Sequence, residues 1–260
     1  MDYNGFTLEI RQMCNIDLSN YKEKQMKRRI ESLIKRNGHE SYASYLKQLK
    51  QSDQHLKEFL GYITINVSEF YRNPSQWQVL EREIIPELML NKKKLKIWSS
   101  ACSTGEEPYS LVMLLNKMKI IDKTKIIASD IDKDALIQAK LGIYSPKGIA
   151  NIPKEMIKTN FQKADDKYII KEEIKKIVDF KILNLLEDTF PSECDLILCR
   201  NVMIYFTEET KEKLYKKFFN ALSGGGIFFV GSTEQIIMPQ KYGFLNRKNF
   251  FYQKIINKNT

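Results

Sequence analysis

The sequence predicts an α/β fold with a Rossmann-like parallel sheet, preceded by an all-helical domain and interrupted by a small β insertion. Two observations predict this fold. Residues 1–64 carry apolar side chains at helical spacing and contain no convincing strand. From residue 95 onward, apolar strand segments alternate with helical segments, which is typical of a parallel sheet covered by helices on both faces. We therefore expect a helical domain and linker over residues 1–72 and an α/β domain over 73–260, with the insertion at about 150–180.

Helix boundaries in the first region follow from local signals. Gly38 is a stop signal for a helix with apolar side chains from Met26 to Ile34, and Ser41 and Asp53 precede the next two helical patterns. Asn73-Pro74 then opens a helix whose apolar face includes Trp77, Leu80, Ile84 and Leu88. The polar and aromatic stretch 64–73 lies between the helical region and this helix, and it lacks the Gly, Ser and Pro content of a plain spacer.

Apolar runs and helical spacing also predict the elements of the α/β region. Expected strands cover 95–99, 125–129, 178–183, 194–199 and 227–230, and expected helices cover 106–118, 132–141 and 207–222. Gly224-Gly-Gly226 is expected to turn into the strand at 227, and Phe244 to Ile256 to form an antiparallel pair. Within the insertion, 168–170 and 174–178 are weak strand candidates.

Composition limits the class of protein. With 260 residues and 43% hydrophobic content the chain can bury a sizeable core, and neither a leader-like start nor a run of about 18 apolar residues is present. We expect a cytoplasmic protein. The four cysteines form no Cys-x-x-Cys pair and there are two histidines, so neither a zinc site nor a disulfide framework is indicated. A formal net charge of +10 predicts an acidic partner, which charge alone does not distinguish among nucleic acid, membrane and protein.

Much of this positive charge lies in the helical segment 21–36. Lys24, Arg28 and Lys35 share one stripe of that helix. Taken alone, the stripe fits a solvated helix face as well as a docking surface. No aromatic side chains alternate with these basic residues, which argues against single-stranded nucleic acid as the partner.

The stretch LKIWSSACSTGEEPYS, from Leu95 to Ser110, passes from strand to small-residue loop to helix. Its single glycine, Gly105, and the acids Glu106 and Glu107 at the helix start disfavour a pyrophosphate and favour a neutral or cationic group. In open parallel sheets, ligands bind at the carboxyl ends of the strands. Asp130 ends the second expected strand, where an acid typically accepts hydrogen bonds from a ribose diol.

Five motifs, in this order and spacing, resemble one enzyme family: TINVSEFYRNPSQW, IWSSACSTGEEPYSL, ASDID, NLLED and CRNVMIYF. They closely resemble the chemotaxis receptor methyltransferases of the CheR type, with Bacillus-like members nearest, and the resemblance covers nearly the whole chain. It implies an S-adenosylmethionine-dependent methyltransferase domain behind a helical receptor-docking domain. The implied cofactor-site residues are Asn66, Ser68, Arg72, Glu107, Asp130, Asn184, Leu185, Arg200 and Asn201. The family usually has threonine where Ser68 stands, so a hydroxyl is kept.

The resemblance also implies a reaction and a partner. Methyl transfer to glutamate side chains in the cytoplasmic helical region of methyl-accepting chemotaxis proteins would give methyl esters and S-adenosylhomocysteine and would serve chemotactic adaptation. Lys24, Lys27, Arg28 and Arg29 would dock these acidic helices. We further expect a monomer without a metal, nucleic-acid partner or membrane insertion, cytoplasmic and recruited to membrane receptor arrays.

The expected chemistry requires positioning more than proton transfer. A glutamate carboxylate, with an ordinary pKa of about 4.3, is already ionised near neutral pH and attacks without a general base. We expect Arg72 to hold the substrate carboxylate or the neighbouring cofactor end, Tyr205 to orient the attacking oxygen, and Glu107 or Glu106 to contact the cofactor's ammonium.

Two other functions remain as alternatives, and one departure from the family bears on the insertion. Nucleic-acid amino-methyltransferases carry an Asn/Asp-Pro-Pro-aromatic loop after the fourth strand, where this chain has Arg200-Asn-Val-Met203. A non-catalytic module is disfavoured by polar residues at every strand end. Some relatives have a glycine-containing β insertion that grips a receptor peptide. Here Asn160 to Phe180 is short and glycine-free, so we expect an insertion without tight peptide tethering.

Overall fold

The computed structural model describes residues 1–255 of the chain. It divides into two compact units, and each is described by itself. The helical unit comprises Met1–Asn66 and Met203–Lys213, and the sheet unit comprises Val67–Val202 and the chain from Leu214 onward. The stretch 67–72, expected to be part of the linker after the helical domain, lies in the sheet unit.

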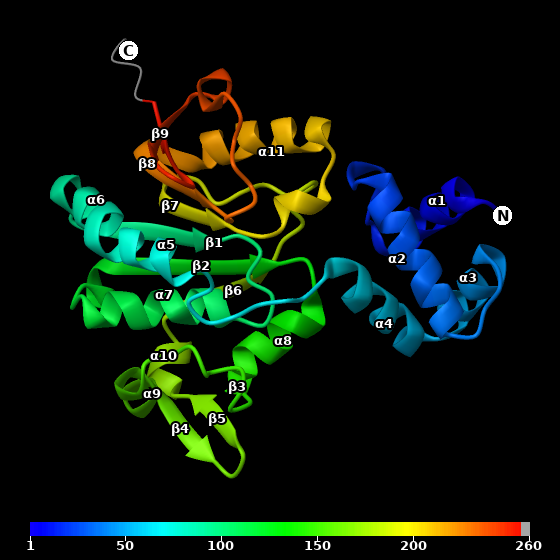
Figure 1. Cartoon of the computed structure of the whole chain (residues 1–260), viewed down its shortest axis with the longest axis horizontal. Coiled ribbons are helices and arrows are strands. Elements are labelled where there is room, and N and C mark those ends of the chain that lie inside the picture. The colour runs from blue at the N-terminus through cyan, green and yellow to red at the C-terminus, as the bar shows by residue number, and fades with distance from the viewer. Residues whose placement is uncertain (256–260) are drawn as a thin grey trace. The chain divides into compact units, whose positions relative to one another are not determined.

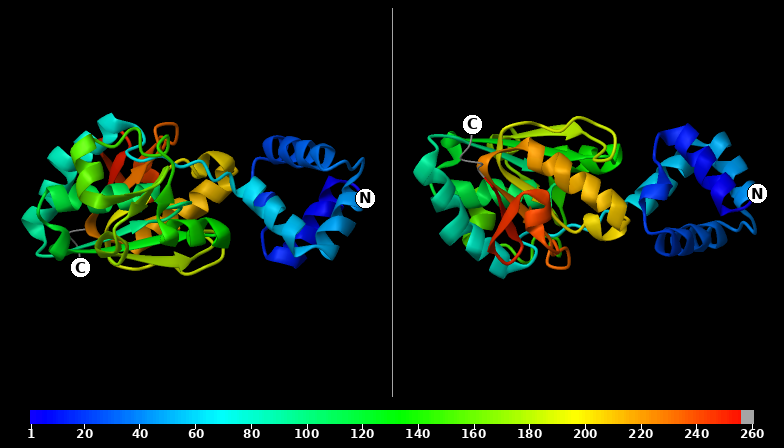
Figure 2. Two further views of the ribbon diagram at one scale, coloured as in Figure 1. Left: turned by 90° about the horizontal axis from the view of Figure 1, so that it is seen from below. Right: turned by 90° about the horizontal axis from the view of Figure 1, so that it is seen from above.

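Four α-helices form the first part of the helical unit: α1 (Tyr3–Cys14), α2 (Glu23–Arg36), α3 (Tyr42–Gln51) and α4 (Asp53–Thr64). Figure 2 shows these blue and cyan helices gathered into one bundle. Phe6, Ile30 and Phe59 are fully buried at its centre. Ser41 caps α3 as expected, whereas the cap of α4 is Ser52 and not Asp53, because the Ser52 hydroxyl accepts the His55 N–H.

The return segment of the helical unit contains the 3₁₀ turn η4 (Met203–Tyr205) and the start of α11 (Glu208–Ala221). Lys22 N–H donates to the Tyr205 carbonyl at 2.8 Å, and Thr207 N–H donates to the Asn20 carbonyl at 2.9 Å. The rings of Tyr21 and Phe206 pack with centroids 5.0 Å apart. These contacts attach 203–213 to the segment between α1 and α2, beside the short η1 turn (Leu18–Asn20).

The sheet unit is built on a seven-stranded sheet of order β6-β2-β1-β7-β8-β10-β9. Strands β1 (Leu95–Ser99), β2 (Thr124–Asp130), β6 (Val178–Ile182), β7 (Cys194–Cys199) and β8 (Leu222–Val230) are parallel, and β10 (Phe251–Lys254) and β9 (Phe244–Lys248) complete the sheet with antiparallel pairs (Figure 1). The chain builds outward from β1 to β2 and β6, then returns to the other side of β1 with β7. The strand order therefore switches between β1 and β7.

The expected strands at 95–99 and 194–199 are confirmed to the residue, and those beginning near 125 and at 178 are confirmed to within one residue at each end. The expected antiparallel pair is also confirmed, although Ile256, the last residue of its expected range, lies outside the described residues. One expectation was wrong in detail. Gly224-Gly-Gly226 does not precede the strand but lies inside β8, where the pairing with β7 shifts register between Cys194 and Leu196.

Helices α7 (Glu106–Lys117) and α8 (Lys133–Leu141) follow β1 and β2. The helix that Asn73-Pro74 opens is confirmed and runs as α5 (Pro74–Val79), a π-helical turn η2 (Leu80–Ile84) and α6 (Ile85–Asn91). The wide turn precedes Pro86, which lacks an N–H and whose ring would clash with a carbonyl one α-turn back. Trp77, Leu80, Ile84 and Leu88 are all buried, as their spacing predicts.

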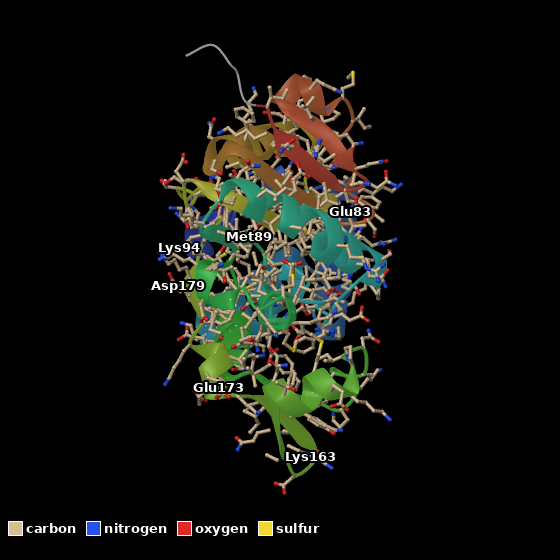
Figure 3. The ribbon with its side chains drawn as sticks, turned by 90° about the vertical axis from the view of Figure 1, so that its left-hand side faces the viewer. Glu83, Met89, Lys94, Lys163, Glu173 and Asp179 are labelled. Carbon is tan, nitrogen blue, oxygen red and sulfur yellow. The ribbon has the colours of Figure 1, made fainter. Side chains whose placement is uncertain are left out.

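A second, three-stranded antiparallel sheet of order β3-β5-β4 forms the insertion. It comprises β3 (Ile143–Tyr144), β4 (Phe161–Ala164) and β5 (Lys167–Ile170), with α9 (Lys154–Asn160) and α10 (Glu172–Lys175) beside it (Figure 1). Lys163 lies near the tip of the β4–β5 hairpin, where Figure 3 shows it pointing into solvent. The expected strand at 168–170 is confirmed, whereas the one at 174–178 was wrong: Ile174 belongs to α10, and Val178 begins β6 of the main sheet.

Residues 1–255 contain no helix with both the length and the apolarity that a membrane crossing requires. All four cysteines are free thiols.

Candidate functional site

The carboxyl ends of the parallel strands bring polar residues to one edge of the main sheet. The loop 100–105 follows β1, Asp130 ends β2, Asn184 and Leu185 follow β6, and Arg200 and Asn201 follow β7. Because β1 lies between β2 and β7, the loop after β1 is flanked by the residues that follow β2 and β7, and the strand order switches between β1 and β7.

Asp130 is tied to the loop after β1. Its carboxylate accepts Ser103 N–H at 2.7 Å on one oxygen and Asp132 N–H at 3.0 Å on the other. Only 8% of the residue is exposed, and this burial raises the pKa of the carboxyl above its ordinary value of 3.8, although the backbone N–H donors act in the opposite direction. A carboxylate has about four acceptor positions, so Asp130 can accept further hydrogen bonds.

The loop after β1 approaches α8 too closely for a larger residue at Gly105. Gly105 adopts φ +93°, and a Cβ there would lie 3.0 Å from the Ala139 Cβ. Ser103 also has positive φ, at 47°, and its N–H donates to Asp130 at 2.7 Å. The Asp130 carboxylate at the end of β2 therefore holds Ser103 in a backbone conformation that is uncommon for residues other than glycine.

Glu107, in the first turn of α7, is held from two sides. Its carboxylate accepts the Ser99 hydroxyl at 2.7 Å and pairs with an Arg200 guanidinium nitrogen at 3.2 Å. The side chains of Arg200 and Glu107 are only 2% and 12% exposed. Burial lowers the pKa of Arg200, and the neighbouring Glu107 carboxylate opposes that shift.

The other terminal nitrogen of Arg200 holds the segment that precedes α5. It donates to the Arg72 carbonyl at 2.7 Å, to the Asn73 side chain at 3.2 Å and to the Gln76 side chain at 2.9 Å. Arg200 thus ties the end of β7, the start of α7 and the residues 72–76 together. We call Arg200, Glu107, Asn73 and Gln76 the guanidinium clamp.

The stretch 67–73 is anchored at further points. Phe70 is fully buried, with its ring centroid 4.8 Å from that of Tyr144 and 5.8 Å from that of Phe161 in the small sheet. Tyr71 N–H donates to the Ser110 hydroxyl of α7 at 3.0 Å. The Arg72 guanidinium folds back onto the Val67 carbonyl at 3.2 Å and is partly exposed, as is Ser68. The stretch 67–73 is therefore packed against α7 and the small sheet within the sheet unit.

Glu106, the neighbour of Glu107, is engaged differently. Its carboxylate accepts the Thr104 hydroxyl at 2.7 Å, and the Thr104 carbonyl accepts the Tyr144 hydroxyl at 2.8 Å. Unlike Glu107, Glu106 has no ion pair among the described contacts. Of the two acids, Glu106 keeps more uncompensated negative charge.

Asn184 and Leu185 lie in a tight turn after β6. The Asn184 side chain accepts Leu186 N–H at 3.0 Å, and Asn184 N–H donates to Asp188 at 2.8 Å. Asp188 N–H and Glu187 N–H both donate to the Asn184 carbonyl. Among the described residues no acceptor takes the Leu185 N–H, so the turn presents one unused backbone donor.

Asn201 is fixed through Glu234, which follows β8. The Glu234 carboxylate accepts Asn201 N–H at 2.6 Å and Gly231 N–H at 2.8 Å, which joins the ends of β7 and β8. Asn201 has φ +60°, a conformation that asparagine tolerates well. A Cβ at Gly231 would lie 2.4 Å from a Glu234 carboxylate oxygen, so this link requires glycine there.

Comparison with known proteins shows the family to which this chain belongs. A family model described as "CheR methyltransferase, SAM binding domain" matches residues 66–251, and one described as "CheR methyltransferase, all-alpha domain" matches residues 1–64. This chain belongs to the CheR methyltransferase family. It is an S-adenosylmethionine-dependent methyltransferase with the helical domain and mixed-sheet domain that the sequence predicted.

Relatives of this CheR methyltransferase match over almost all of their length. The chemotaxis protein methyltransferase of Listeria innocua is 40% identical over 254 residues, covering 97% of each chain. That of Borreliella burgdorferi is 37% identical over 262 residues, covering 92% of this chain and 90% of the relative. Chemotaxis protein methyltransferase 1 of Pseudomonas aeruginosa is 29% identical over 255 residues, covering 93% of each chain.

The strand-end groups of the CheR chain fit a nucleoside-containing cofactor. Asp130 has unused acceptor positions toward which two ribose hydroxyls could donate, and Leu185 has an unused N–H. Within residues 1–255 no group of three His, Cys, Asp or Glu side chains is placed to hold a metal ion.

Two of the expected site residues belong to the helical unit. Asn66 donates to the Thr64 hydroxyl at 3.3 Å, and Tyr205 ends η4 with its carbonyl bound to Lys22 N–H. The remaining expected cofactor residues, Ser68, Arg72, Glu107, Asp130, Asn184, Leu185, Arg200 and Asn201, belong to the sheet unit. Their shared site with Asn66 and Tyr205 stays a prediction.

The basic residues expected to dock a partner differ in how they are held. Lys24 and Arg28 are exposed on α2. Arg29 instead lies over the Tyr62 ring at 4.6 Å and donates to the Tyr62 carbonyl at 2.5 Å, which ties α2 to α4. The Lys27 ammonium lies 5.7 Å from the Tyr3 ring centroid. Lys24 and Arg28 are therefore the members of this set most open to a partner.

Some residues that hold the strand-end segments were not anticipated from the sequence. Gln76 is a buried polar residue on the otherwise apolar face of α5, and that interruption of the pattern was a usable signal. Glu234 is an acid four residues after the end of β8, a weaker signal. Lys217, which donates to the Leu185 carbonyl at 2.8 Å, lies on α11 among other lysines and had no sequence signal.

Proposed function

We propose that this protein transfers the methyl group of S-adenosylmethionine to glutamate side-chain carboxylates of methyl-accepting chemotaxis receptors. The products are glutamate methyl esters and S-adenosylhomocysteine, and the reaction serves chemotactic adaptation. Family membership and the relatives' names support a methyltransferase in chemotaxis. The observation that carries the choice of a carboxylate is that no histidine follows any strand of the main sheet: the chain's two histidines are His39, between α2 and α3, and His55, in α4.

A carboxylate acceptor suits such a site because it needs no general base. A glutamate side chain is ionised well below neutral pH, whereas a hydroxyl or amine acceptor must lose a proton during or after attack. The bound sulfonium supplies an electrophilic methyl group. The protein then has to align the attacking oxygen with that group and exclude water, and such positioning can contribute about 7–11 kcal/mol to lowering the barrier.

We assign the cofactor-binding roles on the same basis. Asp130 accepts the ribose hydroxyls, and Asn184 with the Leu185 N–H borders the base. Ser68, Arg72, Glu107, Arg200, Asn201 and Asn66 line the rest of the site. Because Glu107 is already paired with Arg200, Glu106 is the better candidate for direct charge attraction to the cofactor's ammonium, and Glu107 acts through the clamp. No metal takes part in this proposal.

For the substrate side, Arg72 holds the glutamate carboxylate or the neighbouring end of the cofactor, and Tyr205 orients the attacking oxygen. The Arg72 guanidinium has a single described contact, to a backbone carbonyl, and this contact is easily exchanged for a carboxylate. Attack of an anion on a cation disperses charge in the transition state, so an orienting contact serves catalysis better than a tight ground-state ion pair.

The proposed partner is the acidic cytoplasmic helical region of the receptor, docked by Lys24, Lys27, Arg28 and Arg29. The exposure of Lys24 and Arg28 supports this, whereas Arg29 contributes mainly by holding α2 against α4. We propose further that the enzyme works as a monomer in the cytoplasm, recruited to receptor arrays, without nucleic-acid or membrane-inserted partners. The insertion, whose β4–β5 turn is Asp165-Asp166 and lacks glycine, is proposed not to tether a receptor peptide tightly.

One experiment separates this function from its main rival. The enzyme is incubated with S-adenosylmethionine labelled in the methyl group and with either receptor-containing membranes or nucleic acid, and each product is treated with mild alkali. Release of labelled methanol from protein identifies a carboxyl methyl ester and supports the proposal. Alkali-stable label on nucleic acid, with no methanol from protein, overturns it.

A further inference from the structure

Lys217 lies on the part of α11 that belongs to the sheet unit, and its ammonium is surrounded by backbone carbonyls. It donates to the carbonyls of Leu185 at 2.8 Å, Leu186 at 3.3 Å and Asp188 at 2.9 Å. An ammonium has three N–H donors, so this arrangement satisfies all of them without a carboxylate partner in direct contact. The ammonium also lies 4.3 Å from the Phe190 ring centroid.

These carbonyls belong to the turn that carries Asn184 and Leu185. Four N–H groups bond within the turn, to Asn184 and Asp188, and the Leu185 N–H does not. The carbonyls of Leu185, Leu186 and Asp188 instead accept from Lys217 on α11. Converging carbonyl dipoles repel one another unless a cation or donor lies between them. Lys217 supplies that cation from a helix 32 residues further along the chain.

The Lys217 ammonium is partly buried among its carbonyl partners. Burial lowers its pKa while Asp188 and Glu187 oppose that shift, so part of its hydration has been exchanged for the carbonyl contacts. The adjacent Lys216 is exposed on the same helix and has no described bond to the turn. The contrast between the two neighbours indicates a specific role for Lys217 rather than general surface charge.

We propose that Lys217 is a positioning residue for cofactor binding: its ammonium holds the turn after β6 in the conformation that presents the Leu185 N–H and Asn184 to the cofactor. This inference rests on the proposed cofactor role of Asn184 and Leu185. Lys217 touches neither cofactor nor substrate, so its loss weakens binding of the cofactor and leaves the methyl-transfer step unchanged once the site is filled.

The first test compares Lys217→Met with Lys216→Met. Met keeps most of the aliphatic stem and removes the ammonium, and Lys216→Met makes the same change one residue away. We expect calorimetry with S-adenosylhomocysteine to show about tenfold weaker binding for Lys217→Met and no change for Lys216→Met. The KM for S-adenosylmethionine should rise in parallel, with kcat at saturating cofactor within about twofold of the parent value.

A second measurement needs no ligand. Backbone amide hydrogen exchange over residues 183–189 should be faster in Lys217→Met than in the parent or in Lys216→Met, because the turn opens more often without its cation. The strands on either side should keep their exchange rates. A change spread over the whole sheet unit would instead show general destabilisation and would overturn a role confined to this turn.

A chemical rescue guards against a folding defect. In Lys217→Cys, alkylation with 2-bromoethylamine rebuilds an ammonium on a side chain of nearly lysine length, and the parent protein treated in the same way controls for Cys14, the most exposed native thiol. Restored affinity for S-adenosylhomocysteine supports the proposal. Parent-like affinity in Lys217→Met overturns it while leaving the proposed function standing. A parent protein that does not bind S-adenosylhomocysteine overturns both.

Discussion

A change of pH would affect folding and the proposed ribose binding in opposite directions through the buried Asp130 carboxylate. Its pKa is raised above 3.8, chiefly by burial, so the folded state disfavours the ionised form. The contribution of Asp130 to folding stability is therefore full below its unfolded-state pKa and is lost as pH rises through the raised folded-state pKa. Ribose hydroxyls, in contrast, donate more strongly to the ionised carboxylate, so ligand binding gains at higher pH.

The first prediction concerns this residue. Calorimetry of the parent protein should show S-adenosylhomocysteine affinity that is constant near neutral pH and falls on acidification, beginning above the ordinary aspartate pKa of 3.8. Asp130→Asn should bind about ten- to a hundredfold more weakly at neutral pH and lose this acid dependence, since hydrogen bonds to a charged group contribute about 1.5–3 kcal/mol. Affinity within twofold of the parent would remove Asp130 from the binding site.

The second prediction concerns the proposed catalytic side chains. Arg72→Ala and Tyr205→Phe should each lower the rate of receptor methylation at saturating cofactor by about tenfold or more, since each removes an orienting hydrogen bond of about 1–2 kcal/mol. Tyr205→Phe keeps the carbonyl that Lys22 N–H binds, so η4 is preserved. Tyr168→Phe, in β5 of the insertion, is the matched control. Near-parent rates at saturating cofactor would exclude both residues from the chemistry.

At the scale of elements, the guanidinium clamp joins three pieces that no single strand or helix could align. Arg200 extends from β7, Glu107 belongs to α7, and Asn73 and Gln76 lie at the start of α5. The ion pair is nearly inaccessible to water, so removing one partner leaves an uncompensated buried charge. The order of the stretch 67–73 therefore depends on a residue more than a hundred positions later.

The third prediction follows from this burial. Arg200→Met should destabilise the sheet unit by about 3–5 kcal/mol, the usual cost of breaking a buried ion pair from one side. Adding Glu107→Gln should recover part of this loss, because the unpaired charge disappears. Urea unfolding followed by tryptophan fluorescence measures the sheet unit alone, since Trp77 and Trp98, the chain's two tryptophans, both belong to it. If the stability loss of the double variant equalled the sum of the losses in Arg200→Met and Glu107→Gln, the two residues would act independently, which would argue against the clamp.

Elements formed by continuous apolar runs were predictable, and elements that depend on distant partners were less so. Leu95–Ser99 and Cys194–Cys199 are buried on both faces, so their composition alone indicated central strands. The glycines at 224–226 indicated a turn by local preference. They lie within β8 because Leu222 pairs with Cys194 and a Cβ at Gly226 would lie 2.9 Å from the Cys194 carbonyl oxygen, an approach that no local pattern reveals.

The same distinction holds for the site. Positions at strand ends, such as Asp130 and Asn184, could be anticipated because a parallel sheet gathers them at one edge. The side-chain contacts that hold those positions in place could not be anticipated from the sequence. Whether Glu107 pairs with Arg200, or whether Lys217 binds the turn after β6, depends on side-chain directions set by packing between segments far apart in the chain.

At the scale of the whole molecule, part of the net positive charge of +10 is exposed on α2, where it can attract an acidic partner. Lys24 and Arg28 are exposed on that helix, where contacts to an acidic helical partner would be screened by salt. Charges of this kind raise the rate of encounter and fix the orientation of a partner more than they add affinity. Their effect should therefore be strongest at low ionic strength.

The fourth prediction tests this surface. Lys24→Glu combined with Arg28→Glu should raise the KM for receptor about tenfold at low salt, with a smaller difference at high salt, and should leave the affinity for S-adenosylhomocysteine unchanged. Lys163→Glu combined with Lys167→Glu, on the hairpin of the insertion, reverses the same amount of charge elsewhere and should have little effect on receptor kinetics. Equal effects from both pairs would indicate a response to net charge alone.

The clamp reaches residue 72 through its carbonyl oxygen, a group that every amino acid carries. Replacing the arginine side chain there removes its charge without releasing the segment from Arg200. Asn73 has no such freedom, because its side chain accepts from Arg200 and its backbone has φ +60°. With the proposed role of Arg72, natural variation at position 72 would alter reactivity while the architecture stays intact, so the chemistry of this enzyme would evolve separately from its stability.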